Sequence, residues 1–449
     1  MSETPEPNQF ALLRTRRFLP LFLVQFLGAF NDQVYQKAFV ALVTYRLAET
    51  VDTPIALLGV IASALFILPF AILTPTAGQI ADRVDKAVMM RFVKGWEIVV
   101  MGLAVIGYHT QNIYFLYFVL FLMGAQSAVF APIKYSVLPQ YLTQRELIGG
   151  NGLVQGSTFL AIIFGTILGN ELILTEQGVT LVSIVVVGVA IAGFIASLYT
   201  PSAKPVDPAT VTRRPVDWVF PRAIWMLIRL VAKNRPAFRT IMAISWFWFL
   251  GATFLSLLPA YAKEVLGGDE SVLTVLLAGF SIGVAIGALL SEWACRDRGA
   301  LDVAPYAALG LAVLAIELYA ATPLAPPPEL VDRATFFSDL TGWRILADFV
   351  LLAACAGLYV TPLNAALQKE AEEARRAQYI AASNVIDASF MVVSAAVVGV
   401  LVSLSIGTAE VLVVITLTAL PVAIVLARFA PGTRLGRIAL MLWPRGPIG

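Results

Sequence analysis

The sequence predicts an all-α integral membrane protein with twelve transmembrane helices in two pseudo-symmetric halves of six. Hydrophobic residues make up 59% of the 449 residues and charged residues only 13%, and the mean hydropathy is +0.82. A typical soluble domain is about 25% charged. Runs of about twenty apolar residues, each long enough to cross a bilayer, recur along nearly the whole chain. Short motifs of the first half return in the second half.

Hydrophobic pattern and length place six spans on each side of a long polar segment. In the first half the spans cover residues 18–45, 54–80, 88–108, 113–138, 147–170 and 179–199. In the second half they cover residues 237–262, 271–294, 303–322, 343–367, 379–403 and 408–429. The chain thus divides into an N-terminal half (1–199), a central loop (200–235), a C-terminal half (236–430) and a tail (431–449). Within the loop, we expect residues 216–231 to form an amphipathic helix on the membrane surface.

The distribution of Lys and Arg predicts the orientation of these spans. Basic residues gather before the first span, after spans two, four, eight and ten, in the central loop and in the tail. The opposite side carries few of them. Because cytoplasmic loops carry the excess of Lys and Arg, both termini are predicted to be cytoplasmic. Residues 1–10 are polar and acidic, so we expect the first span, and not a cleaved signal peptide, to direct insertion.

Several classes of function are disfavoured by composition and motifs. The net charge is only +2, which gives no reason to expect a nucleic-acid partner. The two cysteines, Cys295 and Cys355, lie in or beside different spans without metal-ligand spacing. No catalytic triad, phosphate-binding loop or dinucleotide fingerprint occurs in a fitting context. We therefore expect no enzyme activity, no cofactor and no metal.

The middle of the first span is polar. It reads Asn31-Asp32-Gln33, and Gln25, Asp32 and Gln36 fall on one helical stripe. An ionisable group near mid-bilayer costs at least ~2.5–3.5 kcal/mol, so it tends to face protein or a water-filled cavity. Asp32 therefore either braces a neighbouring helix or lines a substrate path. We expect Asn31, Asp32, Gln25 and Gln36 to contribute to a substrate site.

Lys134 is the second intramembrane charge, about one turn inside the cytoplasmic end of the fourth span. It either extends to the interface or forms a pair with Asp32 across a cavity. Further polar positions in later spans are Asn151, Gln155, Asn364, Gln368, Asn384 and Asp387. Each such pair alone is more often a contact between helices than a binding site, but together they mark the cavity side. Arg344 and Asp348, four residues apart, are expected to satisfy each other.

The loop after the second span, residues 78–86, resembles the signature loop of the major facilitator superfamily, G-x-x-x-D-R/K-x-G-x-R/K. In that family the acid, here Asp82, pairs with an Arg and a helix end to latch the cytoplasmic side. The resemblance implies that Gly78, Asp82 and Arg83 take part in gating; otherwise they form an ordinary charged turn. Asp85 stands where Gly is usual. The arrangement of six spans, a long loop and six spans fits the same major facilitator fold.

Five stretches resemble the lysophospholipid transporter family of bacterial inner membranes, a branch of the major facilitators. They are residues 25–32, 131–135, 151–153, 245–248 and 361–368. Such transporters are held to move lysophospholipids, chiefly lysophosphatidylethanolamine, to the cytoplasmic leaflet. There an acyltransferase–acyl carrier protein synthetase, fused to the transporter in some members, restores the second chain. The resemblance implies substrate handling by Asp32 and Lys134. Leu255 is a departure, because standalone members carry a basic residue near this position.

We therefore expect a monomeric lysophospholipid flippase of the bacterial inner membrane that works by alternating access. Its ligands would be lysophospholipid and membrane lipids, and its functional partner the acyltransferase, with no acyltransferase domain in this chain. The polar first half would hold the headgroup and the apolar second half the acyl chain. One alternative is a proton-coupled transporter of drugs or other small amphiphiles, with Asp32 as the titrating group. Another is a membrane anchor for a lipid-remodelling enzyme.

Overall fold

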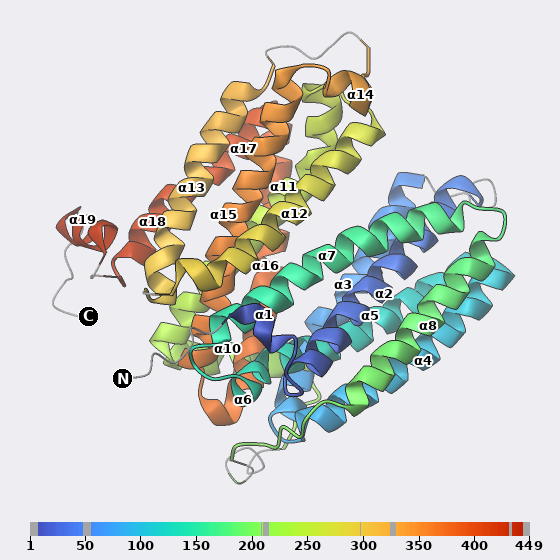
Figure 1. Cartoon of the computed structure of the whole chain (residues 1–449), viewed down its shortest axis with the longest axis vertical. Helices are drawn as coiled ribbons and strands as arrows, with labels where there is room; N and C mark the ends of the chain where they lie inside the picture. Colours follow the sequence, from blue (N-terminus) through green and yellow to red (C-terminus); the bar gives the residue numbers. More distant parts are fainter. Residues whose placement is uncertain are drawn as a thin grey trace. The chain divides into compact units, whose positions relative to one another are not determined.

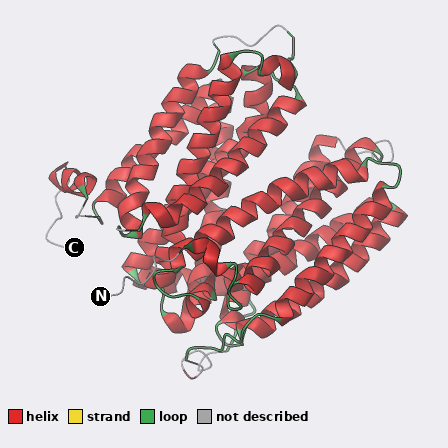
Figure 2. Cartoon of the chain, in the orientation of Figure 1, coloured by secondary structure: helices red, strands yellow, loops and turns green. Residues whose placement is uncertain are grey.

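The computed structural model describes residues 8–47, 55–207, 209, 215–296, 298–323, 329–430 and 433–442. In these residues the chain is mainly helical, and loops and turns connect the helices, as Figure 2 shows. A membrane-spanning segment must pair its backbone N–H and C=O groups internally, and an α-helix does this within one segment. The all-helical prediction is confirmed.

The described part of the first half contains two short helices and six long ones, which Figure 1 labels. They are α1 (Gln9–Leu12), α2 (Leu19–Tyr45), α3 (Ile55–Ala81), α4 (Lys86–Thr110), α5 (Ile113–Ser136), α7 (Leu147–Ile173) and α8 (Gly178–Leu198), with α6 (Leu138–Tyr141) between α5 and α7. The central segment forms α10 (Phe220–Lys233), a 14-residue helix with Pro in its first turn.

The second half repeats this plan. Its helices are α11 (Arg235–Ala260), η2 (Tyr261–Val265), α12 (Glu270–Ala294), α13 (Ala300–Ala321), α14 (Arg333–Phe336), α15 (Leu340–Glu370), η3 (Glu373–Arg375), α16 (Arg376–Ser403), α17 (Thr408–Thr416), α18 (Ala419–Ala427) and α19 (Arg434–Leu442). The expected last span, 408–429, is interrupted between α17 and α18. There the Thr418 hydroxyl accepts a hydrogen bond from Trp246 Nε1 and donates to the Ile415 carbonyl. A hydroxyl that bonds the preceding turn competes with the helix ladder.

Ten helices in the described part of the chain are long and apolar enough to cross a membrane. The long helices α2 and α4 are not among these ten. Both carry ionisable side chains in their interiors, and α2 also carries amide side chains; these polar groups lower the mean hydropathy. The two least apolar spans of the first half are therefore those that carry the polar site described below.

The chain forms two compact units. The first unit comprises Met1–Gly150, Leu160–Phe238 and Gln368–Val385; the second comprises Asn151–Phe159, Arg239–Leu367 and Ile386–Gly449. In the first unit, α2 packs on α8, and α4 packs on both α5 and α8. Small residues allow close approach: a Cβ on Gly165 of α7 would lie 2.7 Å from the Phe30 carbonyl oxygen of α2. Such small-residue contacts are typical of helix packing in membranes.

Aromatic side chains of the first unit fill the space on one side of α2. Tyr35 and Tyr108 are fully buried, with ring centroids 5.5 Å apart. The Tyr35 hydroxyl donates to the Leu116 carbonyl and the Tyr108 hydroxyl donates to the Tyr35 carbonyl. Because buried hydroxyls without partners are costly, these bonds fix the register of α2 against α4 and α5.

Candidate substrate site

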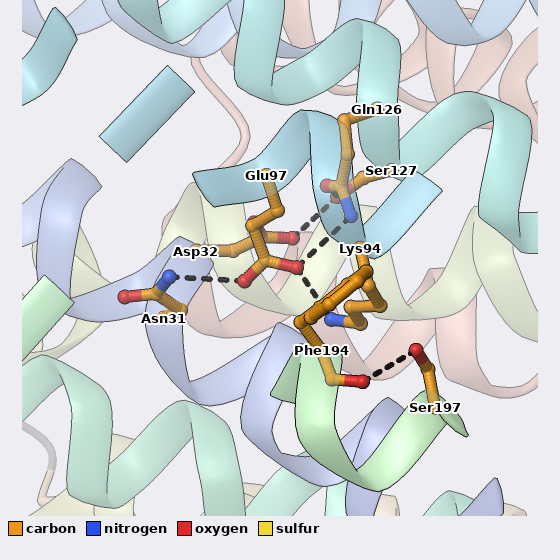
Figure 3. A network of polar contacts seen from close by, with 8 residues as sticks. All are labelled: Asn31, Asp32, Lys94, Glu97, Gln126, Ser127, Phe194 and Ser197. Carbon is orange, nitrogen blue, oxygen red and sulfur yellow. Dashed lines mark hydrogen bonds and ion pairs between the residues drawn. The ribbon is translucent and has the colours of Figure 1, made fainter. Parts of the chain in front are cut away.

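Asp32 of α2 meets Ser127 of α5 in the first unit. The Ser127 hydroxyl donates a hydrogen bond of 2.6 Å to Asp32 Oδ2 and lies 3.0 Å from Gln126 Oε1 (Figure 3). A hydroxyl has one proton to donate, so the shorter contact takes it. Asp32 is only partly buried, whereas its neighbour Asn31 is fully buried. The carboxylate is thus held by one hydroxyl, in a residue that is partly accessible as a whole.

Glu97 of α4 is the centre of a buried network beside Asp32. Its Oε1 accepts from Asn31 Nδ2 at 2.9 Å, and its Oε2 accepts from Lys94 Nζ at 2.5 Å and from Gln126 Nε2 at 3.2 Å (Figure 3). The side chains of Lys94 and Glu97 are only 1% and 2% exposed. A buried ion pair is tolerated when further hydrogen bonds satisfy its remaining lone pairs, and Asn31 and Gln126 supply them here.

Glycines on two helices make room for the Lys94 side chain. A Cβ on Gly28 of α2 would lie 2.5 Å from Lys94 Nζ, and a Cβ on Gly193 of α8 would lie 3.6 Å from Lys94 Cδ. Lys94 also lies three residues before Glu97, so the two project from the same face of α4. The ammonium group is 5.6 Å from the centroid of the Phe130 ring. The two glycines and the spacing on α4 therefore restrict the positions that the Lys94 side chain can take.

Lys134 of α5 completes a set of two acids and two bases. It is partly buried, and its Nζ lies 4.9 Å from the centroid of the Tyr135 ring. It acts on Asp32 through charge, as do Glu97 and Lys94. The formal charges of Asp32, Glu97, Lys94 and Lys134 sum to zero. Because Lys94 and Glu97 pair with each other, Asp32 and Lys134 are the two members of this set without a direct ion pair.

Four members of this network were missed by the sequence analysis: Lys94, Glu97, Gln126 and Ser127. Lys94 and Glu97 lie within the span expected at 88–108, where an ionisable group has the same cost as Asp32 has in the first span. Their spacing of three residues was a further signal, because it predicts an ion pair on one face of a helix. Gln126 and Ser127 gave no comparable signal, since single amide and hydroxyl side chains are common in spans.

The remaining predicted site residues are distributed over both units. Gln25, Gln36, Gln368 and Asn384 belong to the first unit, and Asn151, Gln155, Asn364 and Asp387 belong to the second. Gln25, Asn151, Gln155 and Gln368 are buried. In the second unit, Ser245 Oγ donates a 2.6 Å hydrogen bond to Asp387 Oδ1. In the first unit, Asn384 Nδ2 is buried without a hydrogen-bond partner.

The signature-loop acid Asp82 lies at the N-terminus of α16, within the first unit. Its Oδ1 accepts from the Ala377 backbone N–H at 2.9 Å, and its Oδ2 accepts from the Gln378 backbone N–H at 3.0 Å. The first N–H groups of a helix lack intrahelical partners, so a carboxylate stabilises this end. Burial nevertheless raises the pKa of Asp82 to about 6, although these hydrogen bonds and Lys86 act in the opposite direction. A Cβ on Gly78 would lie 2.6 Å from the Ala381 Cβ, so Gly78 permits this contact.

Asp85 has a structural reason to stand in the signature loop. Its Oδ1 accepts from the backbone N–H of Ala87 at 2.9 Å and thereby caps α4. The same carboxylate accepts hydrogen bonds from Ser202 and Ala203 after α8. Asp85 therefore ties the start of α4 to the segment that follows α8.

The expected ion pair of Arg344 with Asp348 is wrong, because Arg344 pairs with Glu317. Arg344 Nε and Nη2 both donate to Glu317 Oε1 of α13, at 2.8 and 2.6 Å. Two guanidinium donors on one carboxylate give a stronger contact than the intrahelical pair. Asp348 Oδ2 is buried without a hydrogen-bond partner.

Comparison with known proteins identifies the family. Residues 21–395 match the sequence model described as "Major Facilitator Superfamily". The chain belongs to the major facilitator superfamily. Among curated proteins, the lysophospholipid transporter LplT of Serratia proteamaculans is 27% identical over 361 residues, 80% of this chain and 81% of that protein. The lysophospholipid transporter LplT of Cronobacter sakazakii is 26% identical over 376 residues, 82% of this chain and 84% of that protein.

Solved structures show the same fold at low identity. A bacterial homologue of the iron transporter ferroportin, in an outward-facing state, aligns with a TM-score of 0.66 at 14% identity and covers 92% of this chain and 98% of its own. The fucose:proton symporter FucP of Escherichia coli aligns with a TM-score of 0.64 at 13% identity, over 92% and 99% of the two chains. The twelve-helix major facilitator fold is thus confirmed. This multi-pass membrane protein is a transporter and not an enzyme.

Proposed function

We propose that this major facilitator transports lysophospholipids with a zwitterionic headgroup, such as lysophosphatidylethanolamine, towards the cytoplasmic leaflet of the bacterial inner membrane. The observation that carries the proposal is the pair of partly accessible opposite charges, Asp32 and Lys134, beside the buried Lys94–Glu97 pair. The names of the related transporters support the substrate class.

The chemistry of the headgroup matches this pair. A phosphoethanolamine group carries one phosphate and one ammonium. Lys134 provides a point charge for the phosphate, and Asp32 accepts hydrogen bonds from the ammonium. Neither charge is neutralised by a direct ion pair in the described structure, so ligand binding supplies the missing counter-charges. A headgroup held in this way crosses the membrane without facing hydrocarbon.

The second unit exposes apolar side chains on α11. On α11, Trp248 and Leu255 are 36% and 53% exposed, and the two residues are seven positions apart on one face. By this proposal the charged residues of the first unit select the headgroup. The product, a lysolipid in the cytoplasmic leaflet, would then be a substrate for the acyltransferase–acyl carrier protein synthetase.

The test is movement of labelled lysophosphatidylethanolamine in proteoliposomes without an imposed gradient. We expect the wild type to move it and Asp32→Asn and Lys134→Met to lose at least about nine-tenths of the rate, because each removes one counter-charge. Lys37→Met is the matched control: it removes a partly buried lysine of α2, roughly 140° around the helix from Asp32. Asp32→Asn and Lys134→Met proteins that insert normally and transport at the wild-type rate would contradict the assignment.

A proton-coupled transporter of small amphiphiles is the second candidate. It is favoured by one observation, that the Asp32 carboxylate is bound by a neutral hydroxyl and not by a cation. In the same assay, transport that begins only when a pH gradient is imposed, and that is lost in Asp32→Asn, would favour this mechanism.

A further inference from the structure

The helix α10 separates apolar from basic and aromatic side chains. Ala223, Leu227 and Val231 form a buried stripe, and α10 packs against α3. On the exposed side, Trp218, just before the helix, and Trp225 are 74% and 55% exposed. A helix with one buried stripe and exposed Trp and Arg is typical of a segment that lies in the membrane interface. The helix α10 lies at the end of the transmembrane helices that the sequence predicts to be cytoplasmic.

A cavity of about 300 Å³ lies between α10, the signature loop and the start of α16, all within the first unit. Four basic side chains line it: Arg83 from the loop, Arg229 and Lys233 from α10, and Arg375 from η3. Among the described residues that line it, none is acidic. Leu230 supplies part of its apolar wall.

Nearby carboxylates offset only part of this positive charge. Asp82 acts on Arg83 by charge, but both its oxygens accept backbone hydrogen bonds from α16. Glu372 Oε2 lies 3.9 Å from Arg375, at the limit of an ion pair, and is half exposed. Arg229 stacks on Trp225, 4.9 Å from the ring centroid. Four like charges around one cavity repel each other, and a bound anion would relieve this repulsion.

We propose that this cavity binds the phosphate headgroup of an anionic phospholipid from the leaflet in which α10 lies. Basic pockets at the cytoplasmic side of transmembrane helices suit such headgroups, and the volume is at the lower end of the range for small-ligand sites. The exposed Trp218 and Trp225 favour a lipid over a free phosphate, because indole rings lie at the level of lipid headgroups.

A lipid in this cavity would join three segments that are distant in sequence. Gln378 lines the cavity and also donates its side-chain N–H to Asp82 at 3.2 Å. The headgroup would therefore stabilise the contact of the signature loop with α16 while it holds α10 in place. The site uses none of the residues around Asp32 and does not depend on the proposed transport function.

The experiment is thermal unfolding of the purified full chain in detergent during titration with dioleoylphosphatidylglycerol, dioleoylphosphatidylcholine or inorganic phosphate. We expect only phosphatidylglycerol to raise the Tm. The double variant Arg229→Gln/Arg375→Gln should need at least tenfold more phosphatidylglycerol for the same rise. Arg222→Gln is the matched control: it removes an arginine of α10 that pairs with Asp217 and does not line the cavity. Asp32→Asn should respond as the wild type does.

A second variant keeps the test valid if loss of two arginines prevents folding. Leu230→Glu places a carboxylate inside the cavity, so we expect a higher Tm without lipid and loss of the response to phosphatidylglycerol. Equal responses to phosphate and phosphatidylglycerol would overturn the lipid assignment in favour of a free anion. Equal loss of the response in Arg222→Gln and in the double variant would overturn the site itself, because it would show attraction to the basic surface in general.

Discussion

The Lys94–Glu97 pair predicts a strong energetic coupling inside the first unit. Lys94→Met leaves the Glu97 carboxylate with only two amide donors in a site that is 2% exposed. Removing one partner of a buried pair costs about 3–5 kcal/mol in soluble proteins. Each polar contact between membrane helices averages only about 0.6 kcal/mol, which reduces this figure. We therefore expect each of Lys94→Met and Glu97→Gln to lower the free energy of unfolding by about 2–4 kcal/mol.

The double variant Lys94→Met/Glu97→Gln removes both charges, and the amide oxygen that replaces the Glu97 carboxylate can still accept a hydrogen bond from Asn31 or Gln126. Its loss should be smaller than the sum of the two single losses by about 2 kcal/mol, because no uncompensated charge remains buried. The assay is a double-mutant cycle measured by unfolding in mixed micelles with increasing denaturing detergent.

The Arg17–Glu146 pair is the internal control for this cycle. Its separation is also 2.5 Å, but its side chains are 39% and 17% exposed. Partly exposed pairs contribute up to about 1 kcal/mol, so the same cycle on Arg17 and Glu146 should give a coupling well below that of Lys94 and Glu97. Additive losses for Lys94→Met and Glu97→Gln would refute the reasoning, since they would show that the two charges do not depend on each other.

Two further predictions concern the close contacts of the first unit. Gly28→Ala should destabilise the fold by about 1–3 kcal/mol, because the new Cβ would lie 2.5 Å from Lys94 Nζ and would push the ammonium group away from Glu97. Gly102→Ala is the control, because a Cβ there would have no neighbouring atom within 4 Å. It should be neutral or slightly stabilising in the same unfolding assay. The pKa of Asp82 is about 6 when it is docked on α16, against 3.8 for a free carboxyl. The docked form therefore binds more protons, and its stability rises as the pH falls through 6, by at most about 3 kcal/mol. Amide exchange at the start of α16, corrected for the intrinsic rate, should slow between about pH 7 and 5 in the wild type and lose this dependence in Asp82→Asn. Equal slowing in both proteins would contradict the assignment of the pH dependence to Asp82. Lys86, Arg83 and Arg376 are the other charged groups that interact with Asp82.

Much of the fold could be predicted from the sequence because apolar length alone selects membrane helices. The long apolar runs gave the spans, and the repeat of residues 26–30 in 249–254 gave the two halves. The site was predicted less completely. Asp32 was found from its cost in a membrane, but its partner Ser127 comes from another helix, and no local pattern predicts a contact across 95 positions. The partner of Arg344 was missed for the same reason, since Glu317 lies on a different helix.

The first unit holds a buried ion pair, and this pair has a consequence for transport. In the first unit, charges are compensated by charges, as in the Lys94–Glu97 pair. In the second unit, hydroxyls of α11 contact both a hydroxyl and a carboxylate: Thr253 Oγ1 lies 2.7 Å from Ser394 Oγ, and Ser245 donates to Asp387. Leu255 stands where α2 has its acid. A hydroxyl pair needs no counter-ion and costs little in a bilayer, whereas an ionic network must stay neutral as a whole. A zwitterionic ligand preserves the neutrality of Asp32 and Lys134 when it binds, and a singly charged ligand does not. If Asp32 and Lys134 bind the headgroup as proposed, we expect zwitterionic substrates to bind better than simple cations or anions.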